Sequence, residues 1–130
     1  MQNKLGSHAL YTDHYEFTML DALVQSGQVD KKSVFEVFVR ELPLGRPFGV
    51  FAGINRLLPY LKNFSFNKDV LRFLEEEKII SEQTQEFLYS FNFTGNIVSY
   101  REGETYFPCS PVITVAVSYT HLTLPTTVIV

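Results

Sequence analysis

The hydrophobic pattern of this chain changes period at about residue 94, and that change limits the folds the chain can adopt. Before this point, apolar residues mostly recur three or four positions apart, as on one face of a helix; after it, short β-type runs alternate with turn residues. The chain therefore combines helical and β-type segments. The length of 130 residues fits one domain. It excludes a complete (β/α)8 barrel, which takes roughly 250 residues.

Four segments carry helical signals. The first has capping-box spacing between Asp13 and Glu16, with Thr12 as an alternative cap, and Gly27 as a stop. In the second, Pro59 removes one backbone hydrogen bond, which predicts a kink or an early end. The expected helices are Tyr11–Gly27, Val50–Leu61, Asn67–Leu74 and Ser81–Tyr89.

Four other runs have the alternation and the β-branched content of strands. The loop after the first run, ELPLGRPFG, holds two prolines and two glycines, which predicts a structured connection. The expected strands are Ser33–Arg40, Ile97–Arg101, Thr105–Phe107 and Val112–Val117. The phenylalanines of the apolar stripes are expected in the core, namely Phe35, Phe51, Phe73 and Phe87.

Charge and cysteine content exclude several classes of function. A net charge of −3 leaves no electrostatic footprint for nucleic acid. No run of about 18 apolar residues and no signal-peptide pattern is present, so we expect a soluble cytoplasmic protein with no membrane contact. The single Cys109 cannot form an internal disulfide and fits a reducing compartment. His8, His14 and His121 lack ligand spacing, so no metal site is expected.

No self-sufficient catalytic motif occurs, but Asp13 and Tyr15 stand at the mouth of the first predicted helix. From there, an exposed tyrosine ring can stack on a flat heteroaromatic ligand, and a neighbouring carboxylate can accept a hydrogen bond from that ligand. The alternative is that Asp13 only caps the helix and that Tyr15 only packs against Met19.

A second suggestive place is formed by Arg40 and Arg46, which flank a proline- and glycine-rich loop directly after a predicted strand. Guanidinium groups suit phosphate or carboxylate oxygens, and ligands often lie beyond strand ends. The alternative is an ordinary surface ion pair, for example between Arg40 and Glu36 on the same strand face.

Three consecutive blocks of the sequence carry a resemblance to a known family. The strings YTDHYEFTML, FEVFVRELPLGRPFGVFAGINRLLPYL and FTGNIVSYREGETYFPCSPVITV resemble the N-terminal region of nicotinate phosphoribosyltransferase in content, order and spacing. The likeness covers about Leu10 to Val117. It implies an α+β fold, a small α/β-hammerhead-like domain of a type II phosphoribosyltransferase, without the catalytic barrel that would follow it.

The resemblance also implies an activity and its partners. The family joins nicotinate to phosphoribosyl pyrophosphate in NAD salvage, with ATP hydrolysis and Mg²⁺, in homodimers whose sites lie at the subunit interface. Carried over, Tyr15 would stack on the pyridine ring, Asp13 would line the same pocket, and Arg40 would face the pyrophosphate. Arg46 matches the motif. This chain alone, without the barrel, is expected to be inactive and to bind neither ATP nor Mg²⁺.

The end of the chain departs from that family. Glu104 is the last charged residue, and from Ser118 onward the string SYTHLTLPTTVIV resembles translated adapter sequence. We therefore expect residues 1–117 to be the N-terminal domain and residues 118–130 to be a non-native tail; the alternative is a divergent strand. Two other functions stay open: a stand-alone binding module, and a fragment of the related nicotinamide or quinolinate enzymes.

Overall fold

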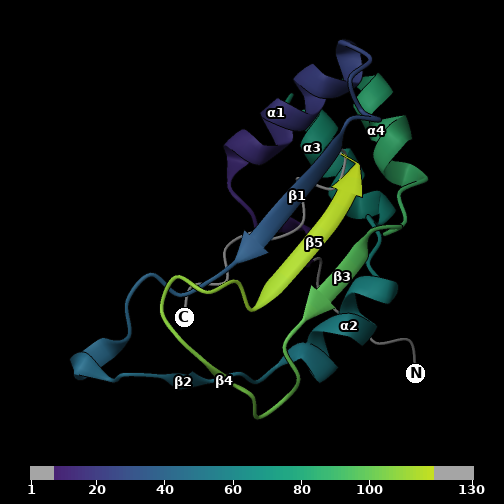
Figure 1. Ribbon diagram of the computed structural model, residues 1–130. Helices are drawn as coiled ribbons and strands as arrows, with labels where there is room; N and C mark the ends of the chain where they lie inside the picture. The colour runs from purple at the N-terminus through teal and green to yellow at the C-terminus, as the bar shows by residue number, and fades with distance from the viewer. Residues whose placement is uncertain (1–7, 119–130) are drawn as a thin grey trace. The chain divides into compact units, whose positions relative to one another are not determined.

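The computed structural model describes residues 8–118, which form two compact units. Residues 8–31 and 64–93 make a helical unit, and residues 32–63 and 94–117 make a unit built around β-strands, called the sheet unit below. Helices and antiparallel strands are thus both present, as the change of hydrophobic period predicts (Figure 1). None of the helices within residues 8–118 is both long and apolar enough to span a bilayer.

The helical unit contains a short 3-10 turn, η1 (His8–Leu10), and three α-helices. These are α1 (His14–Gln25), α3 (Lys68–Glu76) and α4 (Glu82–Tyr89), and α4 packs against both of the others. The predicted starts of α3 and α4 are explained by capping: Asn67 accepts a hydrogen bond from the Val70 amide, and Ser81 accepts one from the Thr84 amide.

The core of the helical unit differs in part from the prediction. The prediction that Phe73 lies in the core is wrong, because this side chain is 46% exposed. It lies beside the buried face of α3. Four other rings meet edge to face instead, with centroids 5.4–6.5 Å apart: Phe17, Phe64, Phe66 and Phe91. Three of these rings lie outside the helices, where helical periodicity gives no signal. The buried apolar side chains of this unit are Ala9, Phe17, Leu20, Val24, Phe64, Phe66, Val70, Leu71, Leu74, Ile80, Leu88 and Phe91.

The sheet unit holds a three-stranded and a two-stranded sheet. In the first, the order is β1 (Lys32–Val37), β5 (Ile113–Ser118), β3 (Asn96–Ser99), with β5 in the middle and antiparallel to β3. Figure 1 shows β5 also running opposite to β1. The second pairs β2 (Gly49–Val50) with β4 (Thr105–Tyr106), also antiparallel. A 3-10 turn, η2 (Pro43–Gly45), lies in the loop between β1 and β2.

One helix, α2 (Ile54–Lys62), packs on the larger sheet. Phe51, Ile54, Val112 and Ile113 form the buried cluster, with Leu57, Ile97, Tyr100, Tyr106 and Val115 packed around it. Of the remaining predicted core phenylalanines, Phe51 is buried, while Phe35 and Phe87 are half-buried.

Three predicted boundaries in the sheet unit are corrected. The early end at Pro59 does not occur, because α2 continues to Lys62 and a proline costs only one backbone bond there. The predicted start at Val50 is also wrong: residues 49–50 are a strand, and Gly53, with φ of 114°, begins the helix. The first strand ends at Val37 rather than Arg40, which leaves Arg40 in the loop.

Candidate functional site

Asp13 and Tyr15 lie at the start of α1, as predicted. Asp13 occupies the cap position by its backbone, whose carbonyl accepts a hydrogen bond from the Glu16 amide at 3.0 Å. Its side chain makes no capping hydrogen bond, so the predicted capping box is wrong. The carboxylate of Asp13 is exposed and is not used to begin the helix. The main alternative to a binding role for Asp13 therefore loses its support.

Tyr15 is 55% exposed, which suits a stacking role for its ring. The pKa of its hydroxyl is raised above the ordinary value, first by a hydrogen bond with the Glu16 carboxylate and then by the negative charge of that group; burial and Asp13 add to this. Glu16 itself is only 5% exposed. The raised pKa keeps the hydroxyl of Tyr15 protonated at neutral pH.

Arg40 and Arg46 lie in the loop of residues 40–48, and both side chains are exposed. The loop is tied down at both ends. At one end, the Cys109 amide donates to the Val39 carbonyl at 2.7 Å, and the Cys109 thiol lies 3.6 Å from the Arg40 carbonyl. β1 ends at Val37, before Arg40, although the hydrogen bond from Cys109 continues the backbone pairing to Val39.

At the other end of the loop, β2 pairs with β4. A side chain at Gly49 would overlap the ring of Tyr106, so glycine is required for this close approach. Between the two anchors, Leu44 and Gly45 both have positive φ, and the Arg46 amide donates to the Pro43 carbonyl at 3.3 Å. The Leu44 side chain is 94% exposed. Short hydrogen-bonded anchors at both ends hold the backbone that displays the two arginines.

The structure thus brings Asp13 and Tyr15 together at one helix start and Arg40 and Arg46 together in one loop. The first pair belongs to the helical unit and the second to the sheet unit. Within residues 8–118, no group of three histidine, cysteine or acidic side chains is placed to hold a metal ion. His121 lies outside the described residues.

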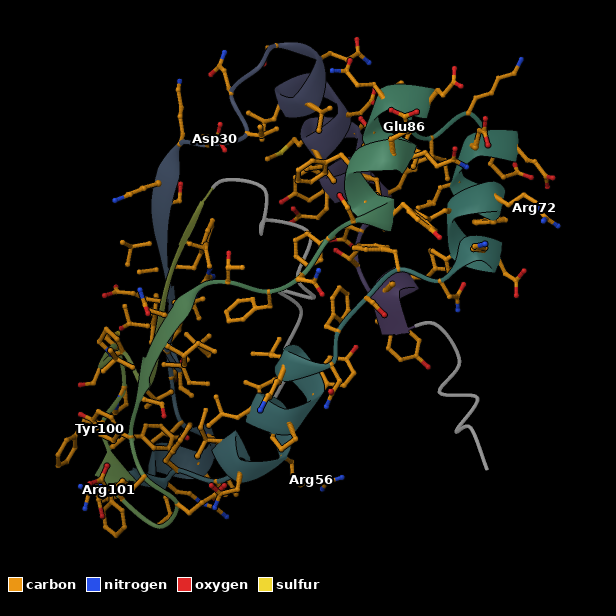
Figure 2. The ribbon with its side chains drawn as sticks, turned by 90° about the vertical axis from the view of Figure 1, so that its right-hand side faces the viewer. Asp30, Arg56, Arg72, Glu86, Tyr100 and Arg101 are labelled. Atoms are coloured by element: carbon orange, nitrogen blue, oxygen red, sulfur yellow. The ribbon has the colours of Figure 1, made fainter. Side chains whose placement is uncertain are left out.

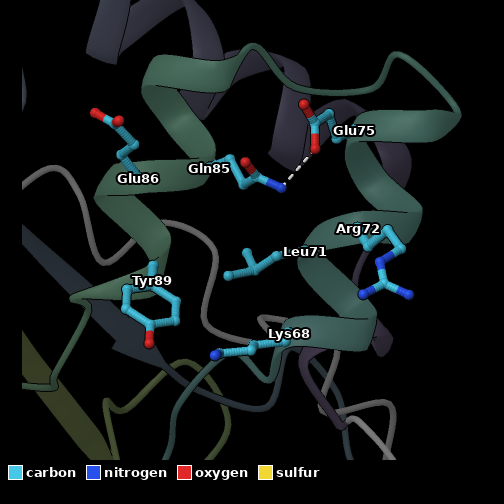
Figure 3. A pocket seen from close by; sticks show the side chains of 7 residues that line it. All are labelled: Lys68, Leu71, Arg72, Glu75, Gln85, Glu86 and Tyr89. Carbon is cyan, nitrogen blue, oxygen red and sulfur yellow. Dashed lines mark hydrogen bonds between the residues drawn. The ribbon is translucent and has the colours of Figure 1, made fainter.

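A groove of about 430 Å³ lies between α3 and α4 (Figure 3). Leu71 forms part of its lining, and a hydrogen bond between Gln85 and Glu75 crosses from α4 to α3. The Lys68 ammonium lies 5.8 Å from the centre of the Tyr89 ring. None of the four predicted site residues lines this groove; its residues are Lys68, Leu71, Arg72, Glu75, Gln85, Glu86 and Tyr89.

Comparison with known proteins identifies the family. The sequence model of the nicotinate phosphoribosyltransferase (NAPRTase) N-terminal domain matches residues 10–130. The chain is 42% identical over 120 residues to nicotinate phosphoribosyltransferase pncB1 of Mycobacterium tuberculosis, covering 92% of this chain and 26% of that protein. It is 34% identical over 112 residues to nicotinate phosphoribosyltransferase of Bacillus subtilis, covering 86% of this chain and 23% of that protein.

A solved structure agrees in fold. The crystal structure of human nicotinic acid phosphoribosyltransferase superposes with a TM-score of 0.76 at 23% identity, covering 86% of this chain and 23% of that chain. The α+β fold expected for such an N-terminal domain is therefore confirmed. The chain belongs to the nicotinate phosphoribosyltransferase family and spans about a quarter of the length of the curated relatives it matches.

These matches leave two predictions as predictions. The family match runs to residue 130, so it does not mark the boundary expected at residue 117, and residues 119–130 lie outside the described part of the chain. The ligand roles of Tyr15, Asp13, Arg40 and Arg46 are likewise not tested by the likeness.

Sequence reasoning missed the residues that hold the loop of residues 40–48, called the arginine loop below. From the sequence alone, Cys109 bears only on disulfides and compartment, and Tyr106 is only part of the strand predicted at Thr105–Phe107. The one available signal was the density of proline and glycine on both sides of this contact, in ELPLGRPFG and in FPCSP.

Proposed function

We propose that this chain is the N-terminal part of a nicotinate phosphoribosyltransferase, which makes nicotinate mononucleotide for NAD salvage. In this reaction the pyridine nitrogen bonds to the anomeric carbon of phosphoribosyl pyrophosphate, and the carbon–oxygen bond to pyrophosphate breaks, with pyrophosphate leaving as the anion. The observation that carries the proposal is the family match over residues 10–130, together with 42% identity over 92% of the chain.

The two candidate places suit the two halves of that chemistry. The exposed ring of Tyr15 would stack on the pyridine ring and hold its nitrogen in line for attack, with Asp13 beside it. Arg40 would stabilise the negative charge that grows on the leaving pyrophosphate, and Arg46 in the same loop would add a second guanidinium. The anchored backbone of residues 39–49 supports such a role, because preorganised charges cost little reorganisation during reaction.

Other parts of the proposal concern the whole protein. We infer that the complete enzyme couples ATP hydrolysis, needs Mg²⁺ and acts as a homodimer in the cytoplasm, where the free thiol of Cys109 fits a reducing environment. Within residues 8–118, no cluster of histidine, cysteine or acidic side chains is placed to hold Mg²⁺. The chain alone is proposed to be inactive.

A segment exchange tests the proposal. Residues 10–117 of this chain replace the matching segment of the Mycobacterium tuberculosis pncB1 protein, and the chimera is assayed for nicotinate mononucleotide, with nicotinamide and quinolinate as competing substrates. Activity with nicotinate is expected, and Tyr15→Ala and Arg40→Ala should each lower kcat/KM by about tenfold or more. Glu82→Ala, an exposed change on α4, is the matched control.

Two outcomes would contradict the proposal. A folded chimera without activity, or one that prefers nicotinamide or quinolinate, would overturn the assignment to nicotinate. The purified 130-residue chain is assayed in parallel: turnover above background would refute the expected inactivity, whereas saturable binding of an unrelated partner without turnover would favour a stand-alone binding module.

A further inference from the structure

Glu102 makes a long-range contact outside the turn in which it lies. It lies in the turn between β3 and β4, yet its carboxylate reaches the start of α2. Oε1 accepts hydrogen bonds from the Gly53 and Asn55 amides at 3.0 Å each, and Oε2 lies 3.0 Å from the Gly53 amide. The Asn55 and Gly53 amides hold the pKa of Glu102 below its ordinary value.

The same two segments are joined by further hydrogen bonds that lead away from Glu102. The Gly103 amide donates to the Phe51 carbonyl, and the Phe51 amide donates to the Glu104 carbonyl, both at 2.8 Å. The pairing of β2 with β4 continues this ladder up to Gly49. Residues 49–55 and 101–106 therefore form one hydrogen-bonded ribbon, with Glu102 at one end.

The other end of the ribbon, at Gly49, adjoins the C-terminal end of the arginine loop. Gly49 directly follows residues 40–48, and the Tyr106 ring lies against it. The opposite end of the loop is held by Cys109, three residues after Tyr106, on Val39 and Arg40. A shift of the ribbon would thus act on the loop at Gly49 and, through residues 107–109, at Val39 and Arg40. Figure 2 shows the region around the turn, with Tyr100 and Arg101 entering it and Arg56 on α2.

We propose that Glu102 is a positioning residue that sets the conformation of the loop of residues 40–48 and so of Arg40 and Arg46. The part played by the arginines rests on the proposed function. Glu102 acts by locking the ribbon to α2; it does not itself contact the substrate. Loss of its carboxylate should leave the helical unit unchanged, because none of the contacts described for Glu102 involves that unit.

The test compares Glu102→Ala, Glu102→Gln and Glu102→Asp in the full 130-residue chain, with Glu82→Ala as control. Glu82 is also an exposed acidic residue near a helix start, but it lies in the helical unit. Amide resonances and amide hydrogen exchange are read by NMR. We expect Glu102→Ala to shift the resonances of residues 40–50 and to speed exchange at Phe51 and Gly103 on the order of tenfold. Glu82→Ala should shift neither region.

Glu102→Gln guards against simple unfolding, since it is neutral and nearly the same shape. If Glu102→Ala unfolds the chain, the Gln variant decides: shifts that reach residues 40–48 support positioning. If its shifts are confined to residues 53–57, Glu102 is only a helix cap and the proposal is overturned. If Glu102→Asp keeps the wild-type resonances of the loop, the carboxylate group matters rather than the length of the side chain. If Glu102→Gln keeps them as well, the role of the charge is refuted.

A kinetic readout keeps this proposal apart from the proposed function. In the segment-exchange chimera, Glu102→Gln should lower kcat with phosphoribosyl pyrophosphate by several-fold with little change in KM, because Arg40 is proposed to stabilise charge that grows only as pyrophosphate leaves. A several-fold rise in KM with unchanged kcat would contradict it. If the unmodified chimera is inactive, the proposed function fails, while the NMR comparison still decides whether Glu102 positions the loop.

Discussion

Replacing Asp21 should lower the free energy of unfolding of the helical unit. The loss should be larger than for any other exposed or half-buried acidic residue of that unit. Asp21 lies on α1, and its Oδ1 accepts hydrogen bonds from the Ser81 amide at 2.8 Å and the Ser81 hydroxyl at 2.6 Å. Oδ2 accepts from the Gln25 amide group at 2.6 Å. One carboxylate therefore ties α1 to the residue that caps α4.

The magnitude follows from these contacts. Hydrogen bonds to a charged acceptor contribute about 1.5–3 kcal/mol each, but the two at Ser81 share one carboxylate and are not additive. The bond to Gln25 is exposed and four residues away, which adds only about 0.2–0.5 kcal/mol. Since Ser81 can still cap Thr84 without Asp21, we expect Asp21→Ala to lower the free energy of unfolding by about 2 kcal/mol, and Asp21→Asn by about 1 kcal/mol.

The contribution depends on pH with a definite sign. Partial burial alone would raise the pKa of Asp21, but the hydrogen bonds from Ser81, Thr84 and Gln25 outweigh it and lower the pKa from its ordinary 3.8. A carboxyl group whose pKa is lower when folded stabilises the protein above the unfolded pKa and loses that effect as pH falls through the folded pKa. The difference between wild type and Asp21→Ala should be complete at neutral pH and shrink below roughly pH 4.

Urea unfolding followed by helical circular dichroism measures this difference at neutral and acid pH, with Glu76→Ala on α3 as the exposed control. A double-mutant cycle with Ser81→Ala isolates the coupling, expected at about 1–2 kcal/mol. The reasoning is refuted if Asp21→Ala falls within about 0.5 kcal/mol of wild type, as ordinary surface changes do. A difference that persists undiminished in acid would refute the charge argument alone.

Three further outcomes are expected. Gly49→Ala should cost about 1–3 kcal/mol, because its methyl group would overlap the Tyr106 ring, and the added cost should largely vanish in a Tyr106→Ala background; equal costs in both backgrounds would contradict this. Leu88→Ala should cost about 2–5 kcal/mol, since the side chain is 0% exposed; a loss under about 1 kcal/mol in denaturant unfolding would show that the site collapses. Asn67→Ala should cost about 1 kcal/mol by removing the cap on the Val70 amide, and Asn67→Asp should restore most of it; no recovery would argue against capping.

Much of the local structure could be predicted because its signals are short-range. Asn67 and Ser81 lie immediately before apolar periodic segments, and both cap the helices they precede. The same logic failed at Asp13, where the side chain that occupies the cap position makes no capping bond. A motif thus predicted where the helix begins without predicting what the carboxylate does. The family, likewise, was recognisable from contiguous blocks of sequence.

By itself, the sequence determined the α+β composition, the approximate helices and strands, and membership of the nicotinate phosphoribosyltransferase family. Only the tertiary structure decided how the arginine loop is held, and which residues join α1 to α4. Glu102 meets Gly53 across 49 positions of sequence, and Asp21 meets Ser81 across 60. Periodicity and capping rules report on neighbours within a few residues, whereas these hydrogen bonds form only after distant segments have packed together.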